Sequence, residues 1–298
     1  MKLAREQRLG QSQLIEEILK PCIDYKTTTH FITGQTNFVE LIHEHFPDIN
    51  HSLSSICLTG LHTCGNLAPS CLRIFTDNHQ ISTICNVGCC YNLLNERFKS
   101  PHDTEVWKAR LEPDADPDRG IYAYLEGIDN EVGFPMSQHL TDQGFSLGRN
   151  ARMLSVQSIH RFVDEKEFPL DNLFYRAVLE VLIVRKWPEL KERIRVGRIK
   201  KCQSFVEFVR KCAVKNSHLD VAAVTDDELV GIFKEFSVEA GFMVLFQLMR
   251  ISIAHVIESV ILIDRLLYLK EINRFEATLV RLFDPVVSPR CYGIVSLK

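Results

Sequence analysis

The sequence predicts an α/β fold in which helices cover a parallel sheet. Two short apolar runs without alternating polar residues, SSICLTGL at 54–61 and ISTICNVG at 81–88, are typical of strands that are covered on both faces. Segments with helical spacing of apolar residues lie before and between these runs. Because strands that alternate with helices usually pair in parallel, this order favours a helix-covered parallel sheet.

Four further elements are expected before residue 80. Residues 3–19 have helical spacing, whereas the β-branched and aromatic segment TTTHFIT at 27–33 predicts a strand. Asn37 is a good N-cap for a helix that stops before Pro47. Asn66 is expected to cap another helix, whose apolar residues fall on one side: Leu67, Cys71, Ile74 and Phe75.

The middle of the chain begins with a long connection. Residues 95–146 include the acidic stretch EPDADPDRG and a tight GFPMS turn, and connections of this length are usually functional lids or disordered segments. Helices are expected at 147–163 and 171–187. Thr225 and Glu228 form a capping box for a further helix.

A long apolar helix and two strand-like runs end the chain. Titratable residues interrupt the apolar stretch at 241–270, which therefore lacks the ~18 uninterrupted apolar residues that a membrane-spanning helix needs. We expect a buried helix of a soluble protein, without membrane contact. The runs ATLVRLFD and CYGIVSLK are close enough to form an antiparallel pair. Seven residues at steps of three and four predict the core seam of the helix: Phe246, Met249, Ile253, Val256, Val260, Ile263 and Leu267.

The composition is that of a globular protein in a reducing compartment. The 298 residues are 46% hydrophobic and 24% charged, which is ordinary for one large or two modest domains. Ten cysteines without a CxxC pair favour an intracellular location. The start, MKLAREQRLGQ, is too charged for a signal peptide, so we expect a cytoplasmic or nuclear protein.

Charge is concentrated in one basic segment. The net charge is −3, yet residues 185–215 contain eleven Lys and Arg against three Glu, with Phe205 and Phe208 among them. Such a segment can bind nucleic-acid phosphates, although a solvated helical face has the same composition. RNA binding through 185–215 is therefore one hypothesis for this segment.

Two polar clusters follow the two apolar strands. His62 and Cys64 follow one strand and Cys89 and Cys90 the other, so four nitrogen and sulfur donors could surround zinc. Adjacent Cys89 and Cys90 would point to opposite faces if their strand continued, and we predict no metal. A Cys64 nucleophile beside His62 is an alternative, and a cofactor-facing edge of the sheet is a third.

Six segments, read in order, carry a family resemblance: GLHTCGNL, VGCCYNLL, GFPMS, YRAVLEVL, VIESVILIDRLLYLKE and LFDPVVSPR. Together they resemble the methyltransferase-like protein 25 family, which includes ribosomal RNA adenine dimethylase domain-containing proteins. The resemblance implies a seven-stranded, Rossmann-like fold that uses S-adenosylmethionine. A shorter echo, HxCG followed by CC, is similar to a type of tRNA 2′-O-methyltransferase and makes RNA the expected substrate class.

The resemblance also implies positions for the site. GLHTCGNL would end the fourth strand and VGCCY the fifth, and GFPMS would lie in a loop above the pocket. Asn66 stands where an aspartate is expected. The implied catalytic residues are His62, Cys64, Asn66, Cys89, Cys90 and Tyr91, and the implied substrate loop is Phe134, Pro135, Met136 and Ser137.

The cofactor half of that fold is not evident. The chain has no GxG sequence, and one strand is expected before residue 56 where the fold needs three. In the family order 3-2-1-4-5-7-6, with strand 7 antiparallel, loss of strands 1 and 2 leaves an incomplete sheet whose fourth strand has an open edge. An open edge favours a protein partner. We therefore expect a truncated chain or short isoform that binds S-adenosylmethionine weakly, or a non-catalytic interaction protein.

These expectations define an organisation in four parts. A partial methyltransferase core would occupy residues 1–95, followed by a lid-like insertion at 96–146. A helical insertion at 147–272 would contain the basic segment, and a strand pair at 273–298 would complete the sheet.

Overall fold

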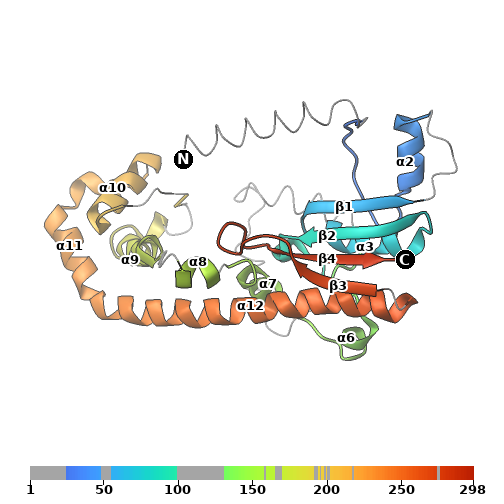
Figure 1. The fold of residues 1–298 in the computed structure, drawn as a ribbon. Coiled ribbons are helices and arrows are strands. Elements are labelled where there is room, and N and C mark those ends of the chain that lie inside the picture. Colours follow the sequence, from blue (N-terminus) through green and yellow to red (C-terminus); the bar gives the residue numbers. More distant parts are fainter. Residues whose placement is uncertain are drawn as a thin grey trace.

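The structure is a computed structural model (Figure 1). The residues that it describes are 25–47, 55–98, 131–157, 159–164, 170–190, 194, 196–197, 199, 202–216, 218–273 and 276–298. The helix expected at 3–19 and most of the long connection lie outside these residues.

Within the described residues, four strands form one sheet in the order β1-β2-β4-β3. β1 (Ile56–Thr63) and β2 (Ile81–Gly88) are parallel. β4 (Tyr292–Leu297) runs antiparallel to both β2 and β3 (Glu276–Arg281). The two apolar runs and the C-terminal pair are thus confirmed as strands, and the pair joins the same sheet.

β1 lies at the edge of this sheet, but the expectation that both of its faces are covered is wrong. Only Leu58 and Thr63 of β1 are buried, and β2 is its one strand neighbour among the described residues. β2 lies between β1 and β4 and is buried along most of its length. A run of apolar residues does not distinguish these two environments.

Helices α2 (Phe38–His45) and α3 (Leu67–Asp77) confirm the two helical predictions near the sheet. The Asn37 side chain accepts hydrogen bonds from the amides of Val39 and Glu40, as its N-cap role requires. Residues 27–33 form no strand, which corrects that prediction. Strand propensity depends on packing against a neighbouring strand, and these residues pair with none of the four.

The helices after the long connection are shorter than expected. α6 (Gln138–Asp142) follows the GFPMS turn, and α7 (Arg149–Leu154) and α8 (Ile159–Asp164) replace the single helix expected at 147–163. A turn at Ser155 separates them, and its hydroxyl donates to the carbonyl of Arg152. A serine that bonds to the preceding turn competes with helical pairing. α9 (Leu170–Lys186) confirms the next helix.

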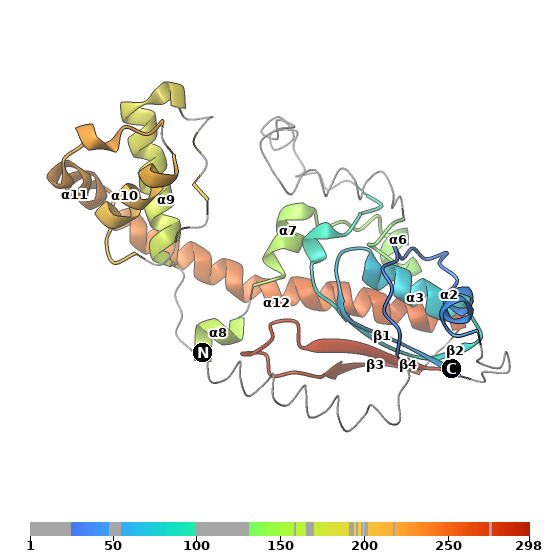
Figure 2. The ribbon, with the colours of Figure 1, turned by 90° about the horizontal axis from the view of Figure 1, so that it is seen from above.

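Two cores share the longest helix, α12 (Ser237–Asn273). Its first part joins a helical core with α9, α10 (Phe205–Lys215) and α11 (Asp226–Glu235). Its last part packs beside α3 along one face of the sheet (Figure 2). Thr225 caps α11 by accepting from the Glu228 amide, as predicted. Short 3₁₀ turns at Tyr91–Leu93, Pro188–Leu190 and Val221–Ala223 complete the described helices.

The predicted core seam of α12 is wrong. Val256 is 60% exposed and Phe246 is 60% exposed, whereas Ile257, Ile261 and Leu262 are buried instead. The other five members of the predicted seam are also exposed or only partly buried: Met249, Ile253, Val260, Ile263 and Leu267. Apolar residues occur all round this helix, so periodicity alone did not select the buried face.

α12 is also long and apolar enough to cross a membrane by length and composition alone, which is weak evidence. Glu258, Asp264 and Arg265 lie in its second half and are buried against the sheet domain. Glu258 and Asp264 have hydrogen-bond partners from other segments. These contacts attach the second half of α12 to the sheet, whereas only 22% of the most apolar window of the helix is buried, so a buried helix without membrane contact stays a prediction.

Candidate functional site

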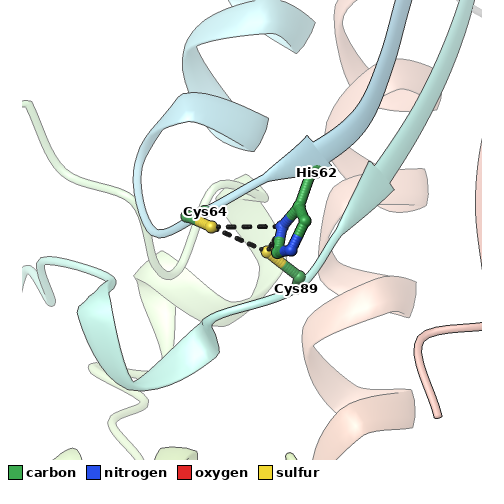
Figure 3. A group of neighbouring side chains, drawn as sticks. All are labelled: His62, Cys64 and Cys89. Atoms are coloured by element: carbon green, nitrogen blue, oxygen red, sulfur yellow. Dashed lines mark hydrogen bonds between the residues drawn. The ribbon is translucent and has the colours of Figure 1, made fainter. Parts of the chain in front are cut away.

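His62, Cys64 and Cys89 converge where β1 and β2 end (Figure 3). Nδ1 of His62 lies 2.8 Å from Sγ of Cys89 and 3.3 Å from Sγ of Cys64. The two sulfur atoms are 2.9 Å apart. Because parallel strands end at the same edge of a sheet, these side chains meet once β1 and β2 are neighbours, which was the condition for their convergence.

Cys90 joins this cluster, against the expectation that Cys89 and Cys90 point to opposite faces. β2 ends at Gly88, so the alternation of a strand does not extend to the two cysteines. The sulfur atoms of Cys89 and Cys90 are 3.6 Å apart. The geometric objection to a four-donor set of one histidine and three cysteines therefore fails.

Gly65 allows the loop after β1 to lie against the loop after β2. Its φ of 53° is in the left-handed region, which glycine adopts without a steric penalty. A Cβ at this position would approach the Cβ of Leu93 to 2.8 Å and its carbonyl oxygen to 2.9 Å. A register shift between Gly60 and Thr63 at the end of β1 precedes this turn. The second half of HTCG, Cys64 and Gly65, therefore forms a tight turn after β1 that packs closely against Leu93.

The thiols of Cys89 and Cys90 are not prepared as nucleophiles. Burial raises the pKa of the Cys89 thiol, and hydrogen bonds to neighbouring thiols raise it further. Burial also raises the pKa of Cys90. A reactive cysteine needs a lowered pKa, usually from a nearby cation or helix N-terminus. The surroundings of these two thiols favour the protonated form.

Tyr91 belongs to the core rather than to the surface of the site. Its hydroxyl donates to Glu258 at 3.2 Å, and the guanidinium carbons of Arg265 and Arg290 each lie 5.5 Å from its ring centroid. Burial raises the pKa of the Tyr91 phenol, so the phenol is protonated at neutral pH. A catalytic role for Tyr91 stays a prediction.

Arg152 holds the segment after β2, a role that the sequence did not reveal. Its Nη1 donates to the carbonyls of Tyr91, Asn92 and Leu94, and its Nε pairs with Glu96 at 2.8 Å. Both partners of the ion pair are largely buried. Arg152 lies about sixty residues along the chain from these carbonyls, and no local motif marks it.

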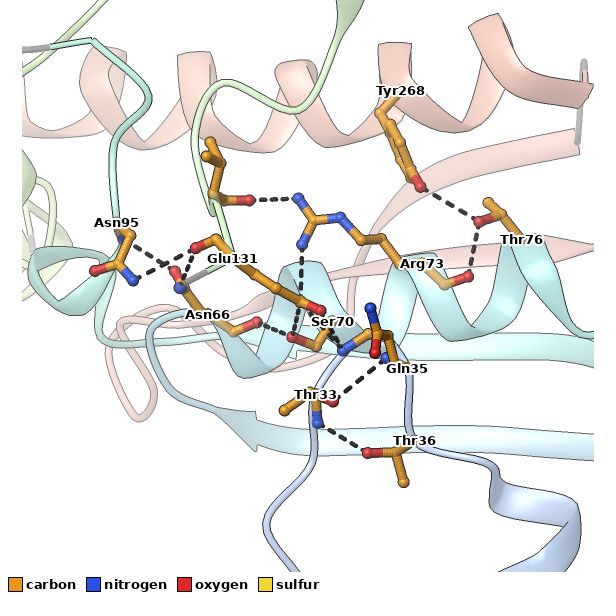
Figure 4. Close-up of polar contacts among 12 residues, drawn as sticks. Thr33, Gln35, Thr36, Asn66, Ser70, Arg73, Thr76, Asn95, Glu131 and Tyr268 are labelled. Carbon is orange, nitrogen blue, oxygen red and sulfur yellow. Dashed lines mark hydrogen bonds and ion pairs between the residues drawn. The ribbon is translucent and has the colours of Figure 1, made fainter. Parts of the chain in front are cut away.

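Asn66 is the N-cap residue of α3, as predicted, but its buried side chain makes no capping hydrogen bond and binds elsewhere (Figure 4). Its side-chain nitrogen donates to the carbonyl of Glu131 at 2.8 Å, and its oxygen accepts from the Asn95 amide at 3.0 Å. Only an amide can make both bonds, which gives a physical reason for asparagine rather than aspartate here. Asn66 joins α3 to two loops, and a catalytic role for it stays a prediction.

Glu131 extends the same network towards the N-terminal segment (Figure 4). Its carboxylate accepts from the Gly34 amide and from the Ser70 hydroxyl, and it pairs with Arg73 at 3.3 Å. Gly34 packs against this carboxylate, because a Cβ there would lie 2.9 Å from Oε1. The network fixes the turn before α2 to α3.

The expected substrate loop is a buried turn in this structure. Asp264 accepts hydrogen bonds from the Met136 amide at 2.7 Å, the Ser137 amide at 2.9 Å and the Ser137 hydroxyl at 2.6 Å. Phe134 and Pro135 are buried, and Phe134 packs in a core with Tyr91. These contacts attach the turn to α12, and a substrate contact by its residues stays a prediction.

Four cations of the basic segment are paired with acids. Arg185 pairs with Glu235, Lys186 with Glu228, Arg210 with Asp226 and Lys211 with Glu207. The cations at 191, 193, 195, 198, 200 and 201 lie outside the described residues. Within the described part, the local acids therefore neutralise much of the charge that the composition suggested.

Comparison with known proteins identifies the family. Residues 7–97 match a family described as "Methyltransferase domain". Two proteins named "Probable methyltransferase-like protein 25", from Mus musculus and Homo sapiens, are each 35% identical over 276 residues, which is 92% of this chain and 41% of the relative. The chain thus spans about two fifths of the length of these curated relatives. No solved structure matches it. The chain belongs to the methyltransferase-like protein 25 family.

Proposed function

We propose that this chain is the substrate-facing half of an S-adenosylmethionine-dependent methyltransferase that acts on RNA. The strand order β1-β2-β4-β3, with β4 antiparallel to its neighbours, carries the proposal. This order equals strands 4-5-7-6 of the seven-stranded sheet that the family resemblance implies. β1 and β2 would then be the fourth and fifth strands, whose carboxyl ends border the reacting groups.

The described residues do not fit S-adenosylmethionine itself. The outer edge of β1, where strand 1 and its glycine-rich loop would pair, has no strand neighbour among the described residues. The sequence also contains no GxG. We therefore assign no residue to the cofactor, and we propose that the strands that cradle it are supplied from outside the described residues.

RNA is supported as the substrate class by the basic segment and by the HxCG and CC motifs. The cations at 191–201 lie outside the described residues, whereas those at 185, 186, 210 and 211 have acidic partners. Because the cations at 185, 186, 210 and 211 are already paired, we propose Arg193, Arg195 and Arg198 as the ones that contact phosphates. Each phosphate contact contributes about −0.7 to the slope of log K against log salt for single-stranded RNA.

A methyl-transfer assay tests the proposal. The full chain would be incubated with S-adenosylmethionine labelled on its methyl group and with cellular RNA. It would be tested alone and together with the part of the human relative that lies outside the 276-residue match. We expect label in RNA only for the combination, because that mixture supplies the strands that we propose to pair with β1. Label in protein but not in RNA would refute the substrate class.

RNA binding is tested separately by charge substitutions. Joint replacement of Arg193, Arg195 and Arg198 by glutamine should reduce the magnitude of the salt slope by about 2. The matched control replaces Arg185 and Lys211, which already have acidic partners, and should leave the slope nearly unchanged. Equal effects of the two sets would remove the basic segment from the RNA interface.

A non-catalytic interaction protein is the second candidate. The edge of β1, which has no strand neighbour in the described part of the chain, favours it, because an unpaired strand edge can accept a strand from another chain. Leu61 on β1 is 68% exposed, as a site for such pairing requires. If the combined proteins transfer no methyl group to RNA or protein, the open edge would favour this candidate over the enzyme.

A further inference from the structure

The cluster at the ends of β1 and β2 brings together nitrogen and sulfur donors of the kind that bind metal ions. One imidazole nitrogen and two thiol sulfurs lie within 4.8 Å of one another, and a third thiol sulfur lies 3.6 Å from the second. His62 is exposed, Cys64 and Cys90 are half-buried and Cys89 is buried. Three sulfurs and one nitrogen at a surface turn are the donors of many structural zinc sites.

The observed distances are close to those that zinc imposes. Tetrahedral zinc, with bonds of about 2.3 Å to sulfur and about 2.0 Å to nitrogen, places its sulfur ligands about 3.8 Å apart and its nitrogen about 3.6 Å from sulfur. The sulfurs of Cys64 and Cys89 are 2.9 Å apart, and Nδ1 of His62 lies 3.3 Å from Cys64. The three donors therefore need to separate by less than about 1 Å. The Cys90 sulfur, 3.6 Å from that of Cys89, is already close to the sulfur-to-sulfur separation of a zinc site.

A buried cation beside the cluster supplies a second, independent observation. Arg265 is 1% exposed, and its Nε and Nη1 have no hydrogen-bond partner among the described residues. A Cβ on Gly88 would lie 2.4 Å from this Nη1, so the guanidinium packs against the residue that precedes Cys89. The neighbouring Asp264 carboxylate is occupied by Met136 and Ser137. Asp264 still interacts electrostatically with Arg265, but two buried donors without hydrogen bonds are costly, and a further anionic group beside Cys89 would stabilise them.

We propose that this donor set binds one zinc ion, with Nδ1 of His62 and the sulfurs of Cys64, Cys89 and Cys90 as ligands. Zinc with three thiolates and one neutral imidazole carries a net charge of −1, which balances Arg265. The ion joins the loop after β1 to the loop after β2 and so fixes the edge strand to the sheet. This inference is independent of methyl transfer and of RNA binding.

The test is the metal content of the full chain, purified without a histidine tag and under reducing conditions. Elemental analysis should find about one zinc per chain. Cys64→Ser and Cys89→Ser should reduce this to near zero. Cys57→Ser is the matched control, because Cys57 is an exposed free cysteine on β1 outside the cluster, and it should retain the zinc.

Cobalt gives a measurement that does not depend on the folding of the variants. Cobalt added to the metal-free parent chain should show the sulfur-to-metal charge-transfer bands and the intense visible bands of tetrahedral thiolate coordination, and one equivalent of zinc should remove them. Absence of these bands would overturn the proposal. Zinc that is bound equally by Cys89→Ser and by the control, or a Cys64–Cys89 disulfide in a zinc-free parent chain, would also overturn it.

Discussion

Substitution of Gly65 by alanine separates two effects that the structure combines at the HTCG turn. The positive φ of Gly65 costs an alanine about 1–2 kcal/mol. The added Cβ would also lie 2.8 Å from Leu93 Cβ and 2.9 Å from the Leu93 carbonyl oxygen, which is backbone and cannot move as a flexible side chain can. Overpacking of this kind costs about 1–3 kcal/mol more. The expected total for Gly65→Ala is therefore about 2–5 kcal/mol.

Gly144 provides the matched control for this substitution. Its φ of 61° is similar, but a Cβ there meets nothing within 4 Å. Gly144→Ala should therefore cost only the backbone contribution of about 1–2 kcal/mol. Urea unfolding of both variants measures the difference, and zinc content is the second readout, which should fall only for Gly65→Ala. Equal losses of unfolding free energy would refute the close approach to Leu93.

Three further substitutions test the networks around the site. Asn66→Asp removes the donor to the Glu131 carbonyl and should cost about 1–3 kcal/mol in urea unfolding, so a change within about 0.5 kcal/mol would contradict the network. On α12, Ile261→Ala should lower the free energy of unfolding by about 2–5 kcal/mol and Val256→Ala by less than about 0.5 kcal/mol. Equal losses would indicate that Val256 is buried in the core, as the sequence predicted. Burial raises the pKa of Asp264 above its ordinary 3.8, so its contribution to stability is full below about pH 4 and falls as pH rises through the raised folded-state pKa. The stability lost by Asp264→Asn, measured by thermal unfolding, should therefore be greater near pH 4 than at pH 7.5, and the opposite trend would disprove this reasoning.

The strands of the fold could be predicted from the sequence because each is a short apolar run that ends in turn residues. Their positions in the sheet were implied by the family resemblance, which left β1 with an open edge. Composition alone did not give them, since β1 and β2 have similar apolar sequences. The buried face of α12 was also beyond prediction. Glu258, Asp264 and Arg265 lie on that face, and the first two have partners from segments more than a hundred residues away in the sequence.

The meeting of His62, Cys64 and Cys89 followed from the topology alone, because both motifs come directly after parallel strands. That Cys90 lies beside Cys89 could be predicted only by knowing that β2 ends at Gly88. Gly88 ends that strand where Arg265 packs against it, and Arg152 then binds the carbonyls of the following turn. Neither arginine is close to the turn in the sequence, so no local pattern could reveal these contacts.

Binding of S-adenosylmethionine to the purified chain tests the central claim most directly. If the described sheet is only the substrate-facing half of a methyltransferase, isothermal titration calorimetry should detect no binding tighter than about 100 µM for the chain alone. Addition of the remaining part of the human relative should produce binding in the range of about 1–10 µM. Binding of the chain alone at about 10 µM or tighter would contradict the claim, because the cofactor cradle would then lie within this chain.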